Sequence, residues 1–153
     1  MNFYLNINKV SKQKSNGTEG GTFTSGAWQT RILNTVVTNE ISGASLSSNQ
    51  ITLPAGTYEI EASAPAYLVT HHKLKLRNIS DTSDALIGTQ AYCLGTDSVQ
   101  TLSFLYGRIT IAAPKIFELQ HYCSVTQATL GFGIASGFNV IEIYARIWIK
   151  KVA

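Results

Sequence analysis

The sequence predicts an all-β domain, an antiparallel β-sandwich of the jelly-roll type with about eight to ten strands. Two observations favour this class. Apolar and polar residues alternate with a period of two in several segments, and turn-forming residues recur about every 8 to 12 residues. No segment carries apolar residues at the spacing of an amphipathic helix. Because 153 residues suffice for one hydrophobic core, we expect a single domain over residues 1–153.

The N-terminal part combines a short strand with a polar loop. Apolar and polar residues alternate over residues 3–9, which predicts the first strand. Residues 11–26 are rich in Ser, Thr and Lys and contain four glycines, a composition that favours an exposed loop. We therefore divide the domain into an N-terminal strand plus flexible loop, residues 1–26, and a sandwich body, residues 27–153.

The middle of the chain has the strictest alternation. Pro54-Ala55-Gly56 predicts a tight turn, and a strand follows it with its glutamates on one face and apolar residues on the other. The next strand, residues 72–78, presents Lys and Arg outward. The opposite charges predict that these two strands pair as a hairpin. The core residues predicted in them are Tyr58, Ile60, Leu74 and Leu76.

The last three predicted strands, residues 99–112, 116–125 and 140–152, have apolar residues on both faces. A sandwich with one core needs a single apolar face per strand, so the second face predicts a subunit interface. Alternatively, the aromatic residues of the final strand cap the sandwich edge or pack under the 11–26 loop. The residues assigned to the core face of this strand are Ile141, Ile143, Ile147 and Ile149.

Charge and hydropathy exclude two classes of partner. The net charge is +3, and the twelve Lys and Arg residues are scattered rather than gathered in a basic stripe, which argues against nucleic acid. No segment approaches the roughly 18 consecutive apolar residues of a membrane span, so we expect no membrane insertion. The N-terminus lacks the pattern of a secretory signal, which predicts a protein that is made in the cytoplasm and is not secreted by a signal peptide.

No residue pattern indicates an enzyme, and we predict no catalytic residue, metal site or cofactor. His71 and His72 are adjacent on a strand, so their side chains point to opposite faces. His121 and Cys123 share a face and could form a metal or nucleophile site with Cys93, but no carboxylate has a suitable spacing. Buried free thiols are the favoured interpretation. Glu59 and Glu61 lie on a solvent face and more plausibly aid solubility than catalysis.

Three runs of sequence carry a resemblance to known proteins. Residues 20–35 (GGTFTSGAWQTRILNT), 51–66 (ITLPAGTYEIEASAPA) and 137–152 (GFNVIEIYARIWIKKV) resemble a domain found in bacteriophage virion proteins, at tail-fibre tips and on head surfaces. The turn and strand LPAGTYEIEA and the long apolar final strand also resemble the trimeric jelly roll of the tumour-necrosis-factor and complement globular-head superfamily. The resemblance covers the chain from Gly20 onward.

This resemblance implies a homotrimer and indicates which surface forms it. In that superfamily, the sheet that contains the final strand packs around the threefold axis, which agrees with the two apolar faces of that strand. The interface candidates that follow are Phe104, Tyr106, Tyr122, Tyr144 and Trp148.

The resemblance also implies a place on a virus particle. The first strand begins within a few residues of Met1, which leaves no room for the anchor and shaft of a fibre and favours a stand-alone trimer. We therefore expect a capsid decoration, or cement, protein that stabilises the head surface of a virion by contacting the major capsid protein or another virion protein. The alternative is a receptor-binding tip of a tail fibre or head fibre, which adheres to a glycan or protein of the host surface.

Overall fold

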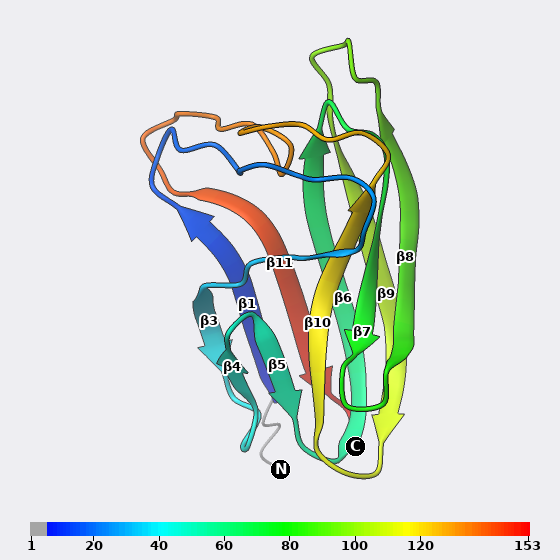
Figure 1. The fold of residues 1–153 in the computed structure, drawn as a ribbon. Helices are drawn as coiled ribbons and strands as arrows, with labels where there is room; N and C mark the ends of the chain where they lie inside the picture. The colour runs from blue at the N-terminus through cyan, green and yellow to red at the C-terminus, as the bar shows by residue number, and fades with distance from the viewer. Residues whose placement is uncertain (1–5) are drawn as a thin grey trace.

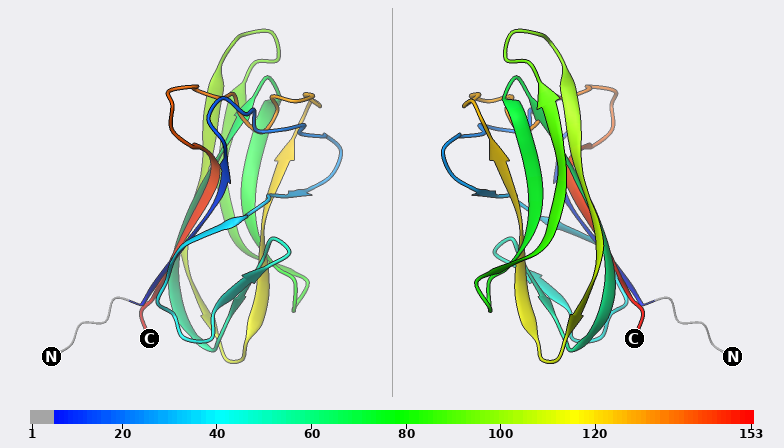
Figure 2. Two further views of the ribbon diagram at one scale, coloured as in Figure 1. Left: turned by 90° about the vertical axis from the view of Figure 1, so that its left-hand side faces the viewer. Right: turned by 90° about the vertical axis from the view of Figure 1, so that its right-hand side faces the viewer.

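The chain folds into two antiparallel sheets packed face to face, as a computed structural model that describes residues 6–153 shows (Figure 1, Figure 2). The first sheet has the order β3 (Thr35–Asn39), β1 (Ile7–Lys14), β11 (Glu142–Lys151), β6 (Gly56–Tyr67), β9 (Gln100–Ile111). The second has the order β4 (Ser45–Ser47), β5 (Gln50–Leu53), β10 (Lys115–Cys123), β7 (Thr70–Asn78), β8 (Ser83–Cys93), and β2 (Gln29–Thr30) also pairs with β10. Over the described residues, no helix is long and apolar enough to cross a membrane.

This architecture confirms the predicted fold class. Successive strands such as β5 and β6, or β9 and β10, belong to different sheets, which is the connectivity of a jelly roll. Residues 6–153 contain eleven strands, slightly more than predicted, because β2 and β4 are only two and three residues long.

The main core lies between the two sheets. Six of the predicted core residues are at most 1 % exposed and confirm the prediction: Tyr58, Ile60, Leu74, Leu76, Ile147 and Ile149. Alternation works here because each strand buries one face against the opposite sheet.

A β-bulge in β11 makes the other two core predictions wrong. In the pairing with β1, Ala145 is opposite Lys12 but Ile143 is opposite Gln13, so Tyr144 is an extra residue. A bulge reverses the alternation of the strand on one side of it. Ile141 and Ile143 therefore face solvent, 52 % and 39 % exposed, while Tyr144 is buried in their place.

The predicted hairpin between the strand that follows Pro54-Ala55-Gly56 and the strand over residues 72–78 is also wrong. β6 pairs with β11 and β9 in one sheet, whereas β7 pairs with β10 and β8 in the other. Lys75 and Arg77 form ion pairs with Asp84 of the adjacent strand β8, each at 2.9 Å. The basic residues of β7 therefore pair with an acid of β8, the next strand in the chain, and not with the glutamates of β6.

The expected exposed loop over residues 11–26 is largely ordered against the rest of the domain. Ser11 and Lys12 belong to β1 and are buried, and the predicted residues Phe3 to Leu5 lie outside the described part. The loop beyond β1 runs across one end of the sandwich beside residues 127–133 (Figure 1), where Phe23 and Gln127 exchange backbone hydrogen bonds of 3.0 Å. Phe23 is fully buried in a second cluster with Ala66, Val69, Cys93 and Cys123.

Phe23 should therefore contribute strongly to stability. Its ring stacks on the Phe132 ring with the ring centres 4.4 Å apart, and its centre lies 4.7 Å from the centre of the His121 ring. Phe23→Ala should lower the free energy of unfolding by about 3–5 kcal/mol, because it removes a buried ring and leaves a cavity. Urea unfolding checks this, with exposed Thr24→Ala as the control. Equal stability of the two variants would contradict the anchored position of the loop.

Candidate subunit interface

The outer face of the five-stranded sheet carries a row of large side chains that crosses four strands. The register places Lys9 beside Trp148, Trp148 beside Glu61, and Glu61 beside Tyr106. The Lys9 amine lies 5.5 Å from the centre of the Trp148 ring, a cation–π distance. Tyr106 is 71 % exposed and Trp148 44 % exposed. We call this surface the aromatic face, formed by the outward side chains of β1, β11, β6 and β9.

A second row on the aromatic face runs parallel to the first. It joins Ser11, Arg146, Ser63 and Phe104, again one residue from each of the four strands. Phe104 is 53 % exposed. Within residues 6–153 Arg146 forms no ion pair, so its guanidinium is available to a group outside the subunit.

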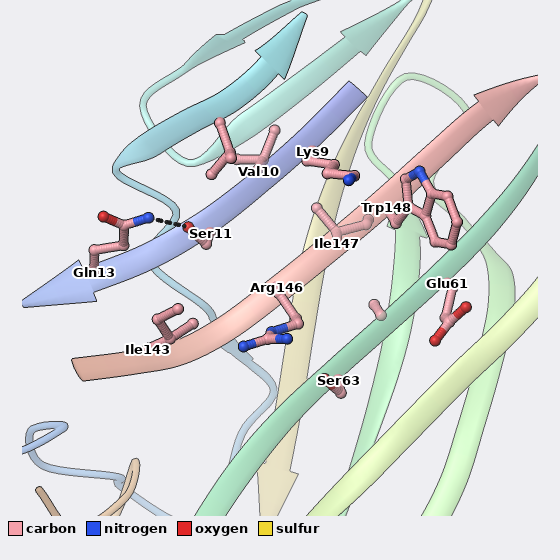
Figure 3. Close-up of a pocket in the computed structure, with 12 residues that line it drawn as sticks. Lys9, Val10, Ser11, Gln13, Glu61, Ser63, Ile143, Arg146, Ile147 and Trp148 are labelled. Carbon is pink, nitrogen blue, oxygen red and sulfur yellow. Dashed lines mark hydrogen bonds between the residues drawn. The ribbon is translucent and has the colours of Figure 1, made fainter. Parts of the chain in front are cut away.

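Between the two rows, the aromatic face is hollowed into a groove of about 380 Å³. Figure 3 shows Trp148, Arg146 and Ile143 of β11 beside Glu61 and Ser63 of β6, with β1 on the other side. Ile143, misplaced by sequence reasoning as a core residue, thus lines the groove. An aromatic or aliphatic side chain of another molecule fits a concavity of this size and lining.

A charged row borders the aromatic face toward the end of β11. Lys150 is beside Glu59, and Glu59 is beside Arg108 in the register. Arg108 donates to Glu59 at 2.6 Å, and this hydrogen bond holds the pKa of Glu59 below its usual range. The face therefore combines exposed aromatic rings with interspersed charged side chains and has a charged row at one border. Aromatic residues and arginine are enriched in protein interfaces.

The five predicted interface residues do not share one surface. Phe104, Tyr106 and Trp148 lie together on the aromatic face. Tyr122 is on β10, in the opposite sheet, and Tyr144 is buried behind the bulge inside the subunit. Those two assignments are wrong for an interface on this sheet, because pattern alone did not separate the sheets or reveal the bulge.

His72, His121 and the two cysteines are buried in the interior of the domain. As predicted, His71 and His72 point to opposite faces, and only His72 is buried. Its Nδ1 lies 2.9 Å from Nε2 of His121, and its Nε2 lies 2.8 Å from Oγ1 of Thr101 in the other sheet. Burial and the charge of Arg31 lower the pKa of His72 to about 4, and burial lowers that of His121 well below its ordinary value.

The two cysteines are buried free thiols, which confirms the favoured interpretation. Burial raises the pKa of Cys123 to about 11, so the thiol stays protonated at neutral pH. A nucleophilic cysteine needs the opposite shift, toward the thiolate. The His121–Cys123 pattern therefore positions groups for packing rather than for attack on a substrate.

Two buried charged residues escaped sequence reasoning. Arg31 has its guanidinium 4.1 Å from the centre of the Phe132 ring and donates to the carbonyl of Tyr144. Glu142 accepts from the backbone amides of Gly17 (3.1 Å), Ser136 (3.1 Å) and Gly137 (2.8 Å). The three amides lower the pKa of Glu142 to about 2. The only sequence signal for the role of Glu142 was the position of a single acid in an apolar strand directly after a glycine-rich segment.

Glu142→Gln should destabilise the domain at neutral pH, because an amide cannot accept all of these hydrogen bonds. The folded pKa of Glu142 is below the ordinary value of 4.5, so its stabilising effect is complete above pH 4.5 and is lost as the pH falls toward 2. The difference from wild type in urea unfolding should therefore shrink between these pH values. Asp97→Asn, in the exposed β8–β9 loop, serves as the control, and a pH-independent difference would contradict this role.

Comparison with known proteins places the fold. No protein-family model and no curated protein matches the sequence. Among solved structures, the globular domain of zebrafish complement 1qA is similar with a TM-score of 0.61 and 12 % identity, over 97 % of this chain and 98 % of that one. Murine APRIL, crystallised at pH 5.0, is similar with a TM-score of 0.58 and 6 % identity, over 95 % and 98 %. The chain therefore has the jelly-roll fold seen in tumour-necrosis-factor-like and complement C1q globular domains.

Proposed function

We propose that this chain is a non-enzymatic binding module that works as a homotrimer, with its subunits in contact through the aromatic face. The observation that carries the proposal is the exposure of Trp148, Tyr106 and Phe104 in neighbouring rows of one sheet face, where Trp148 also lines a groove. The solvent face of an antiparallel sheet is ordinarily polar, so three large exposed aromatic side chains on one such face mark a candidate interaction site.

The number of subunits rests on the fold. The superfamily resemblance implies a threefold axis beside the sheet that contains the final strand, and β11 is the central strand of the five-stranded sheet. Phe104 and Tyr106 are exposed on β9, the last strand of this sheet, so in a trimer they would contact the groove beside Trp148 of the next copy. Arg146 then meets polar groups that its own subunit does not supply.

The buried chemistry of the domain supports a role without catalysis. The side chains of His72 and His121 are buried, and the Cys123 thiol stays protonated. Glu59 is paired with Arg108 rather than with a second carboxyl group across a cleft. None of these groups has the environment of a general acid, base or nucleophile.

For the biological setting, we propose a structural protein of a bacteriophage virion that decorates and cements the capsid. The sequence resemblance to virion surface domains supports this role, and a trimer would bring three copies of the opposite sheet to the shell subunits. Purified trimers should rebind capsids stripped of the protein and raise their resistance to heat. Trimers that do not rebind would refute the capsid role while leaving self-association unaffected.

The second candidate is a receptor-binding tip of a tail or head fibre. It is favoured by half-exposed aromatic side chains, Trp28 and Tyr122, on the sheet that faces away from the aromatic face. Such a tip should bind host cells and block infection by the phage. Absence of both effects would argue against it.

A further inference from the structure

A second groove lies on the outer face of the six-stranded sheet. Its volume is about 360 Å³. We call it the outer groove, and its lining residues are Trp28, His71, His72, Lys73, Gln90, Tyr122 and Ser124. The groove is on the opposite side of the sandwich from the aromatic face, so it stays open when that face is covered.

The outer groove is built from two cross-strand rows. Tyr122 is beside Lys73, and Lys73 is beside Gln90, which places an aromatic ring, an amine and an amide in line. In the next row, Ser124 donates its backbone N–H to His71, which is beside Tyr92. Rigid strands thus hold the polar groups at fixed spacing between aromatic rings.

The aromatic rings of the outer groove are fixed in position although they are half-exposed. The rings of Trp28 and Tyr122 meet edge to face with their centres 5.5 Å apart. The Lys75 amine lies 4.2 Å from the centre of the Trp28 ring and is held by Asp84 at 2.9 Å. Because these contacts order Trp28 in advance, a ligand that stacks on it loses little conformational entropy.

We propose that the outer groove binds an acidic saccharide, a sugar that carries a carboxylate. Sugar rings stack their C–H faces on aromatic side chains, and their hydroxyl groups exchange hydrogen bonds with amide and hydroxyl groups such as those of Gln90 and Ser124. The charge of the lining selects an acidic sugar, because it contains Lys73 and no carboxylate. Of the acids on the adjacent strands, Asp84 of β8 is already bound to Lys75 and Arg77, and Glu118 of β10 accepts hydrogen bonds from Thr30, Gln50 and Gln120.

This inference gives a ligand class to the receptor-binding candidate, and it rests on that candidate for its biological meaning. The contacts themselves lie within one subunit and do not need the trimer. A trimer would present three outer grooves, and simultaneous attachment of several sugars would strengthen weak single-site binding.

Saturation-transfer NMR and titration of the whole protein test the proposal, with sialyllactose and a glucuronate-terminated disaccharide as acidic probes and lactose as the neutral probe. Acidic probes should receive saturation, and Lys73→Gln should weaken their binding about tenfold or more, the effect of losing a charged hydrogen bond. Trp28→Ala should weaken acidic and neutral sugars alike. Phe138→Ala, an exposed aromatic residue outside the groove, should change nothing.

Three outcomes would overturn the proposal: no saturation of either acidic probe, equal binding by wild type and Lys73→Gln, or tighter binding of lactose than of sialyllactose. Amide spectra of each variant verify that the fold is intact, and Lys73→Gln keeps the assay decisive if Trp28→Ala is unstable. If trimerisation fails, a monomer should still bind the acidic sugar. If sugar binding fails in a stable trimer, the groove assignment is wrong and the trimer stands.

Discussion

Trp148→Arg should convert the proposed trimer into monomers that keep their fold. Trp148 is at the centre of the aromatic face, and tryptophan at the centre of an interface is a frequent hot spot, whose truncation costs about 2 kcal/mol or more. Arginine adds to this cost, because its charge loses its hydration in the covered groove, where Lys9 and Arg146 repel it and Glu61 is the one acid among the lining residues. In the isolated subunit the side chain is 44 % exposed, so arginine is readily accommodated there.

Gel filtration with light scattering measures this effect at micromolar concentration. Ile87→Arg is the matched control, because Ile87 is 54 % exposed on β8 of the opposite sheet. The control should remain trimeric, and both variants should unfold cooperatively. A Trp148→Arg protein that is still trimeric would locate the interface elsewhere on the domain.

Acid should destabilise the domain between pH 6.5 and about 4, through the buried pair His72 and His121. The folded pKa values of both rings are below the ordinary 6.5, to about 4 for His72, so the unfolded chain binds protons more readily. Their effect is therefore absent above pH 6.5, and stability falls as the pH drops toward 4. His72 alone should account for a loss on the order of 3 kcal/mol at pH 4, since its pKa falls from 6.5 to about 4 and one pKa unit corresponds to about 1.4 kcal/mol. His121 adds to this loss.

The physical cause of this pH dependence is the lack of a counter-charge around the pair. The charged group that acts on both rings is Arg31, itself buried, and the other neighbours are Thr101 and the Phe23 ring. A protonated histidine there would add a cation next to a cation.

The double variant His72→Gln/His121→Gln should have a flatter dependence of unfolding free energy on pH over this range, measured by urea unfolding. Glu142→Gln separates the two acid effects, because Glu142 titrates at lower pH. An unchanged slope between pH 6.5 and 4 in the histidine variant would assign the acid sensitivity to other groups.

Periodicity predicted the elements whose environment is regular. β6 and the second half of β11 alternate strictly, because each buries one face against the opposite sheet, and the core residues from Tyr58 to Ile149 in these strands follow from that pattern. The apolar second faces of β9 and β11 likewise indicated the surface that holds Phe104, Tyr106 and Trp148. A period of two is a local property, so a single sequence suffices to detect it.

The errors arose where the answer depends on contacts between distant segments. Nothing local in the final strand marks the bulge that buries Tyr144 and exposes Ile143. Sheet membership is also non-local, so Tyr122 could not be separated from Trp148, nor could β6 and β7 be assigned to different sheets. The composition of residues 11–26 resembled a loop because their order comes from residues 127–133, more than a hundred positions away.

The mass of the protein in solution tests the central claim most directly. One chain has a mass of 16.6 kDa, so a homotrimer held by the aromatic face should sediment at equilibrium as a single species of about 50 kDa at micromolar concentration. The Trp148→Arg variant, measured alone at the same concentration, should sediment at the mass of the monomer. A wild-type protein that sediments at 16.6 kDa would contradict the account, because its exposed aromatic rows would then have no partner in a second copy.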